Sequence, residues 1–75
     1  METIKLWKDN SLDKEYSLSI KELSKGYLKS KYNSVYYNFE RGFSLYVAYE
    51  LNSAFEPTKK DWDLIWSEVK KKSLT

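Results

Sequence analysis

The chain has 75 residues, enough for one small domain, and its 3 Trp, 7 Tyr and 3 Phe supply the apolar surface for a core. It contains no Cys and no His, which excludes a disulfide, a thiolate metal site and a histidine base. The net charge of +2 is only mildly basic, and seven tyrosines are more than a small core needs. Some of these tyrosines are therefore expected to lie on a contact surface.

Residues 1–16 are expected to form an N-terminal strand or arm, since Ile4, Leu6 and Trp7 lie in an otherwise polar stretch. A turn is predicted at Asp9–Ser11, followed by a charged connector at 13–16. No apolar run approaches the roughly 20 residues of a membrane span, and the N-terminus lacks the apolar core of a signal peptide. The expectation is a cytoplasmic protein with no membrane partner.

A helix-turn-helix is predicted over residues 17–42. Ser19 and Glu22 have the spacing of a capping box, which marks the start of its first helix. The apolar residues that follow recur on one helical face: Ile20, Leu23 and Tyr27.

A second helix is expected after a short polar turn. Ser30 or Asn33 would cap it, Val35 and Phe39 would face the core, and Gly42 would end it, because glycine accepts the left-handed conformation that follows helices.

The period of the pattern changes over residues 43–56, for which a β-hairpin is predicted. Apolar residues there occupy alternate positions: Phe43, Leu45, Val47, Tyr49 and Leu51. The same stretch also fits a helical stripe, which would extend the second helix and give an all-α three-helix bundle. The hairpin is favoured because Gly42 would be unfavourable inside a helix, and because aromatic and β-branched residues are frequent in strands.

A C-terminal helix is predicted over residues 58–72, capped by Thr58 and Asp61. Its apolar residues have helical spacing: Trp62, Ile65, Trp66 and Val69. The expected fold class is therefore α+β, a single winged helix-turn-helix domain over 1–75 with the hairpin as its wing. The predicted core comprises Ile20, Leu23, Tyr27, Val35, Phe39, Leu45, Val47, Trp62, Ile65 and Trp66.

Three segments occur in a characteristic order. Residues 18–25 read L-S-I-K-E-L-S-K, residues 34–42 read S-V-Y-Y-N-F-E-R-G, and residues 55–66 read F-E-P-T-K-K-D-W-D-L-I-W. Together they resemble the excisionase-type (MerR-like) winged helix-turn-helix family, the small directionality factors of phages and conjugative transposons. The resemblance implies a non-enzymatic protein that binds duplex DNA and steers a recombinase.

The chain departs from this family where DNA contacts are expected. Family wings are usually rich in arginine, whereas residues 43–55 here contain no Lys or Arg. Tyr37 and Asn38 stand where basic residues are common in the family. Phosphate contacts from basic side chains supply most sequence-independent affinity, so the predicted wing is a poor phosphate clamp.

The candidate DNA-binding residues lie on the second helix and at the start of the last one. An Asn side chain can pair with adenine and Arg with guanine, while lysines position the phosphates. The full set is Lys31, Asn33, Ser34, Tyr37, Asn38, Arg41, Lys59 and Lys60.

The alternative function is a protein-binding module, either an accessory subunit of a replication or recombination enzyme or a phage-type inhibitor of a host protein. Tyrosines of the second helix and the hairpin would form its interface: Tyr36, Tyr37, Tyr46 and Tyr49. Under both interpretations the protein is not an enzyme, and no cofactor, metal or small-molecule substrate is expected.

Overall fold

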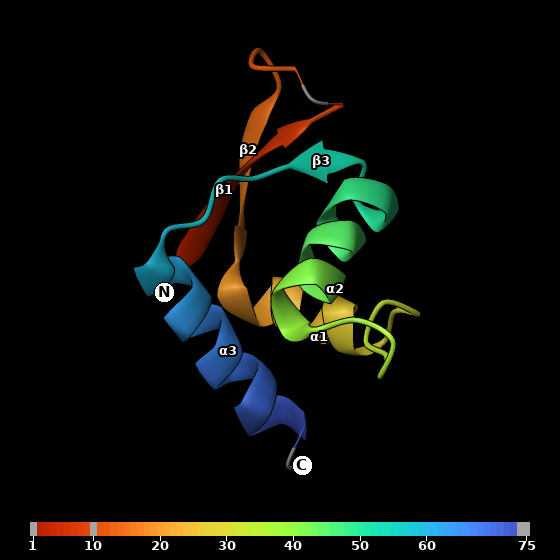
Figure 1. Cartoon of the computed structure of the whole chain (residues 1–75). Helices are drawn as coiled ribbons and strands as arrows, with labels where there is room; N and C mark the ends of the chain where they lie inside the picture. Colours follow the sequence, from red (N-terminus) through yellow and green to blue (C-terminus); the bar gives the residue numbers. More distant parts are fainter. Residues whose placement is uncertain (1, 10, 74–75) are drawn as a thin grey trace.

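The computed structural model of the chain describes residues 2–9 and 11–73. Within these described residues, three strands and three α-helices form a mixed α+β structure, with the sheet at one end and the helices below and beside it (Figure 1). In chain order the elements are β1 (Thr3–Lys8), β2 (Glu15–Ser19), α1 (Ile20–Leu28), α2 (Phe39–Leu45), the π-helical turn η1 (Tyr46–Glu50), β3 (Ser53–Ala54) and α3 (Lys59–Ser73). The α+β class is confirmed, and the all-α alternative is wrong.

The sheet is antiparallel, with strand order β2-β1-β3. β1 is therefore the central strand, and in its first half buried Ile4 and Leu6 alternate with exposed Thr3 and Lys5. The predicted N-terminal strand exists, but the predicted connector at 13–16 is wrong. Glu15 already begins β2, which pairs with β1 along its whole length.

The turn predicted between these strands is described only in part. The N–H of Ser11 donates to the carbonyl oxygen of Lys8 at 3.0 Å, and the N–H of Lys8 donates to that of Lys14 at 2.9 Å. Asn10 and Met1 lie outside the described residues.

Helix α1 forms as the sequence predicts. The side-chain oxygen of Ser19 accepts a hydrogen bond from the N–H of Glu22 at 3.1 Å, which satisfies a donor that the first helical turn leaves unpaired. Its apolar side chains, Ile20, Leu23 and Tyr27, are all buried.

Residues 43–50 are helical, so the predicted hairpin over 43–56 and its role as a wing are wrong. Helical spacing buries Phe43, Tyr46 and Val47 together, whereas a strand would turn Tyr46 to the opposite side from the other two. The N–H of Leu51 donates to the carbonyl oxygen of Tyr46 at 3.3 Å, the five-residue step of a π-turn that ends this helix.

Gly42 lies inside α2 and does not end a helix, contrary to the prediction. No glycine has a positive φ in the described chain. A Cβ atom at Gly42 would lie 2.6 Å from the carbonyl oxygen of Tyr32, so glycine is needed for the close approach of two backbones. Its cost to helix propensity, about 1 kcal/mol relative to Ala, is offset by that packing.

Helix α3 begins one residue later than predicted. The hydroxyl of Thr58 accepts from the N–H of Asp61 at 3.2 Å, and the carboxylate of Asp61 accepts from the N–H of Thr58 at 2.9 Å. This reciprocal pair is a complete capping box. No helix in the described part of the chain is both long and apolar enough to cross a membrane.

One core cluster joins the sheet to the helices. Its buried apolar residues are Ile4, Leu6, Ile20, Leu23, Tyr27, Phe43, Tyr46, Val47, Ile65 and Val69. Three predicted core residues lie outside this cluster: Val35 is 97% exposed, Trp66 is 45% exposed, and Leu45 is only partly buried. Phe39 and Trp62 pack against the cluster while partly buried.

Candidate interaction site

The site is built on a loop, residues 29–38, where the sequence predicts the start of a second helix. Serine side chains bind the backbone there instead. The Ser30 hydroxyl donates to the carbonyl oxygen of Tyr27 at 2.7 Å, and the Ser34 hydroxyl accepts from the N–H of Tyr36 at 3.2 Å. The prediction of a helix from Ser30 or Asn33 to Gly42 is therefore wrong. The physical reason is that such local side-chain bonds compete with the backbone bonds of a helix.

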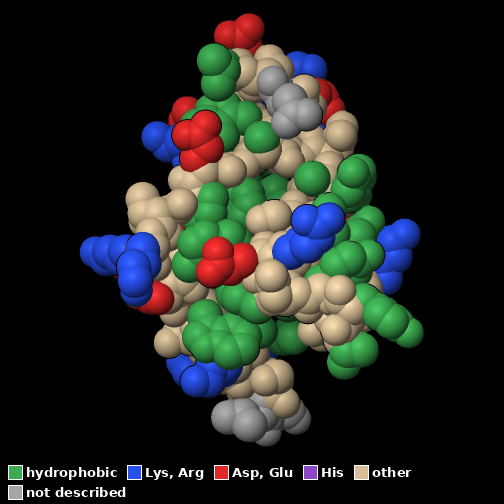
Figure 2. All heavy atoms as spheres, viewed as in Figure 1, with side chains coloured by type: hydrophobic (Ala, Val, Ile, Leu, Met, Phe, Trp, Pro, Cys, Tyr) green, Lys and Arg blue, Asp and Glu red, His purple; other side chains and the backbone are tan. Residues whose placement is uncertain are grey.

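The tip of this loop carries apolar side chains in solvent. Val35 is 97% exposed and Tyr36 is 89% exposed. Hydrophobic side chains protrude from the surface at the lower right of Figure 2, where Figure 1 has the loop between α1 and α2. Because its serines bind the backbone and Gly42 packs against Tyr32, the loop holds these side chains outward in a defined conformation.

Tyrosine rings connect the loop to the end of η1. The ring of Tyr32 lies 6.4 Å from that of Tyr37 and 6.3 Å from that of Tyr49, the second pair being nearly parallel at 21°. We use the name tyrosine face for the surface formed by Tyr32, Val35, Tyr36, Tyr37 and Tyr49.

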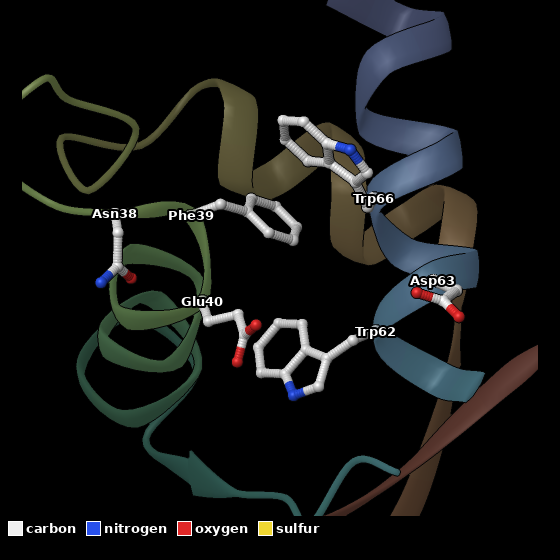
Figure 3. Close-up of a pocket in the computed structure, with 6 residues that line it drawn as sticks. All are labelled: Asn38, Phe39, Glu40, Trp62, Asp63 and Trp66. Carbon is white, nitrogen blue, oxygen red and sulfur yellow. The ribbon is translucent and has the colours of Figure 1, made fainter. Parts of the chain in front are cut away.

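A cleft of about 420 Å³ opens between the start of α2 and the first half of α3. We call it the indole cleft; it is lined by Asn38, Phe39, Glu40, Trp62, Asp63 and Trp66. Figure 3 shows Trp62 and Trp66 projecting from α3 toward α2, with the Phe39 ring between them. The centroid of the Phe39 ring lies 5.7 Å from that of Trp62 and 4.7 Å from that of Trp66.

The two surfaces are continuous through Trp66. This side chain lines the indole cleft and also a neighbouring groove, whose other walls include Asn33, Ser34, Tyr37 and Lys70. Tyr37 belongs to the tyrosine face, so aromatic surface extends from the loop tip into the cleft. A single partner chain can contact both.

The charges around the indole cleft differ from those of the whole chain. Two carboxylates, Glu40 and Asp63, line it, and no basic residue does. Asp63 pairs with Lys59 at 3.4 Å across the surface of α3, with both side chains well exposed. Lys70 lies over the ring of Trp66, with its Nζ 5.7 Å from the ring centroid.

The structure does not gather the predicted DNA-binding residues on one surface. Asn33, Ser34 and Tyr37 line one groove, whereas Lys59 and Lys60 belong to the first turn of α3. Lys31 lies over the ring of Tyr32, with Nζ 5.4 Å from its centroid. No single exposed helix face presents these residues.

The predicted base-reading residues Asn33, Asn38 and Arg41 differ in their local bonding. The side-chain oxygen of Asn38 accepts from the N–H of Arg41 at 2.8 Å and so caps α2. Arg41 itself is exposed in the first turn of that helix. The amide of Asn33 donates to the carbonyl oxygen of Leu28 at 3.4 Å.

Among the tyrosines predicted for a protein interface, Tyr46 is wrong because its side chain is only 8% exposed. Burial raises the pKa of its hydroxyl, and the nearby Glu50 and Tyr16 raise it further. Tyr36, Tyr37 and Tyr49 are exposed, as that prediction requires.

Val35 and Trp66 were missed as surface residues in the sequence analysis, because each matched an apolar helical position. One signal was available: Val35 stands among Ser30, Asn33 and Ser34, residue types that favour turns over helix interiors. The described residues hold no group of three or more His, Cys, Asp or Glu side chains that could bind a metal ion.

Comparison with models of protein families, with curated proteins and with solved structures returned no match. The resemblance to excisionases thus stays a prediction from the sequence motifs, and the site has to be interpreted from its own chemistry.

Proposed function

We propose that the chain is a non-enzymatic protein-binding module whose interface is the tyrosine face. The observation that carries this proposal is the exposure of Val35 and Tyr36, 97% and 89%, on a loop held by side-chain hydrogen bonds. An accessory subunit of a replication or recombination enzyme, or an inhibitor of a host protein, would use such a surface.

The composition of the surface supports this function. Exposed apolar patches mark interaction sites in small proteins, and tyrosine and tryptophan are enriched among the residues that contribute most to binding. Tyr32, Tyr37 and Tyr49 support one another through ring contacts, which reduces the side-chain entropy lost when a partner binds.

The experiment is quantitative affinity purification from extracts of the source organism. Wild type is compared with V35S/Y36S, which removes the apolar tip, and with Leu12→Ser, which changes an 84% exposed apolar side chain in the β1–β2 turn. The same protein should be retained by wild type and Leu12→Ser and lost with V35S/Y36S. Equal retention by all three chains would contradict the proposal.

Duplex DNA binding of the excisionase or small-regulator kind is a second candidate, favoured by a different surface. Lys21, Lys25 and Lys29 follow one another at four-residue steps along α1 and its end, and all three are exposed. They carry no ion pair in the described part of the chain. Such a row of cations can follow a phosphate backbone.

Fluorescence anisotropy with a mixed-sequence duplex across a salt series tests this candidate. If the three lysines neutralise three phosphates, a plot of the logarithm of the binding constant against the logarithm of the salt concentration should have a slope of about −2.7. Each phosphate contributes about −0.9 to this slope. K21Q/K25Q should make this slope less steep. K8Q/K14Q removes the same charge next to the turn between β1 and β2 and should leave the slope unchanged. Absence of binding at low salt would eliminate DNA as the partner.

A further inference from the structure

The indole cleft combines aromatic faces with negative charge. Trp62, Trp66 and Phe39 form its walls, Glu40 and Asp63 lie at its edge, and no Lys or Arg lines it, although the whole chain has a net charge of +2. Figure 3 shows the Glu40 carboxylate beside the Trp62 ring. Its volume of about 420 Å³ lies within the range of ligand sites, roughly 300–1,000 Å³.

Indole rings attract cations through the negative potential of their faces. The chain already shows this at the rim, where the Lys70 ammonium group lies over Trp66. Trp62 has no cation of the described chain over its ring. The Lys59–Asp63 pair is 90% and 69% exposed, so it contributes little energy and leaves Asp63 able to interact with another cation.

The ring of Trp62 is fixed before any ligand arrives. Phe39, Phe43 and Phe55 contact it at centroid distances of 5.7, 5.9 and 5.7 Å, all with edge-to-face geometry. Phe43 is fully buried, so this support is anchored in the core. A fixed aromatic wall loses little entropy on binding.

We propose that the indole cleft binds the guanidinium group of an arginine side chain on the protein partner. This inference rests on the proposed function and specifies the partner's chemistry. A guanidinium is planar and weakly hydrated, so it stacks on an indole face while its N–H groups donate to a carboxylate such as Glu40. An ammonium group forms no such stack.

The position of the cleft fits a partner that also contacts the tyrosine face. Trp66 lines both the cleft and the groove that contains Tyr37. The arginine would enter the indole cleft from its open side, next to Glu40, while apolar groups of the partner cover Val35 and Tyr36.

The test is a titration of the whole chain with N-acetyl-arginine amide, followed through the indole N–H signals in ¹⁵N-correlated NMR spectra. Signals of Trp62 and Trp66 should shift, while Trp7, on β1, serves as the internal reference. The uncharged citrulline analogue should bind at least about tenfold more weakly, because it lacks the cation. The lysine analogue should also bind more weakly.

Variants separate the roles of charge and ring. Glu40→Gln should weaken binding of the arginine probe roughly two- to fivefold, which is the usual effect of losing an exposed charge pair. Asp13→Asn, the same loss of charge in the distant β1–β2 turn, should have no effect. Trp66→Leu, at a half-exposed position, should abolish the shift at Trp62 without unfolding the chain.

An equal response to arginine and citrulline, or no shift at either indole, would overturn the inference. The proposed function is judged separately, by partner retention in V35S/Y36S. If neither indole signal shifts but the chain still retains its partner, only the arginine site is contradicted. If the indole signals shift with arginine but the chain retains no protein, only the proposed function is contradicted.

Discussion

Ser24 is fully buried in α1, and its hydroxyl oxygen has no hydrogen-bond partner among the described residues. Burying an unpaired hydroxyl costs about 1–3 kcal/mol. Ser24→Ala removes that group and improves helix propensity, so the free energy of unfolding should increase by about 1 kcal/mol. Urea denaturation measures this change, and a loss of stability would show that the hydroxyl is bonded.

Gly26 contributes to packing through its lack of a side chain. A Cβ atom there would clash with the hydroxyl oxygen of Tyr46, on the opposing η1 turn. Gly26→Ala should therefore destabilise the fold by about 1–3 kcal/mol, although alanine is normally the better helix former by about 1 kcal/mol.

The control for this contact is the double variant G26A/Y46F. Removing the hydroxyl oxygen should recover part of the lost stability, so the two changes should not be additive in a denaturation cycle. A stabilising effect of Gly26→Ala alone would contradict the packing described for α1 against η1.

At the scale of elements, the start of α2 depends on one side chain. Asn38 caps the helix by accepting from the N–H of Arg41. Asn38→Ala should lower the free energy of unfolding by about 1 kcal/mol, within the usual range of about 0.5–2. Asn33→Ala loses only a long bond to Leu28 and should cost less. Equal effects of the two changes in urea denaturation would contradict the capping role.

Elements with local signals could be predicted from the sequence. Ser19 with Glu22, and Thr58 with Asp61, mark helices that begin within a residue of the expected position. Their caps and apolar faces are encoded within one or two turns. The pairing of β1 with β2 was missed although a short turn joins the two strands, because β2, Glu15–Ser19, is mostly polar and gives only a weak strand signal.

Residues 43–51 show why the other elements were missed. Their apolar residues satisfy a period of two and a helical period at once. The helix is favoured because it buries Phe43, Tyr46 and Val47 together against α1 and the sheet. Only the tertiary structure shows that these three side chains share one core. The same ambiguity placed Val35 in the core and left the indole cleft unrecognised.

At the scale of the whole molecule, stability should depend on pH through buried tyrosines. Burial raises the pKa of Tyr27, and burial together with Glu50 and Tyr16 raises that of Tyr46. The folded chain holds these protons more tightly than the unfolded one. Their contribution is therefore complete below the unfolded pKa of about 10 and is lost as pH rises through the folded values.

Chemical denaturation at a series of alkaline pH values checks this dependence. The free energy of unfolding should fall above pH about 10, and Y27F/Y46F should show a smaller decrease than wild type. An identical decrease in both chains would assign the effect to lysine deprotonation instead.

Binding of a protein by the tyrosine face is tested by the affinity of the purified partner for wild type and for Tyr36→Ala. Tyr36 is 89% exposed, so the change leaves the fold intact. Tyr36→Ala should reduce the affinity about thirtyfold or more, as expected for a residue whose truncation costs about 2 kcal/mol. Unchanged affinity, with the partner still bound, would place the interface elsewhere and contradict the account.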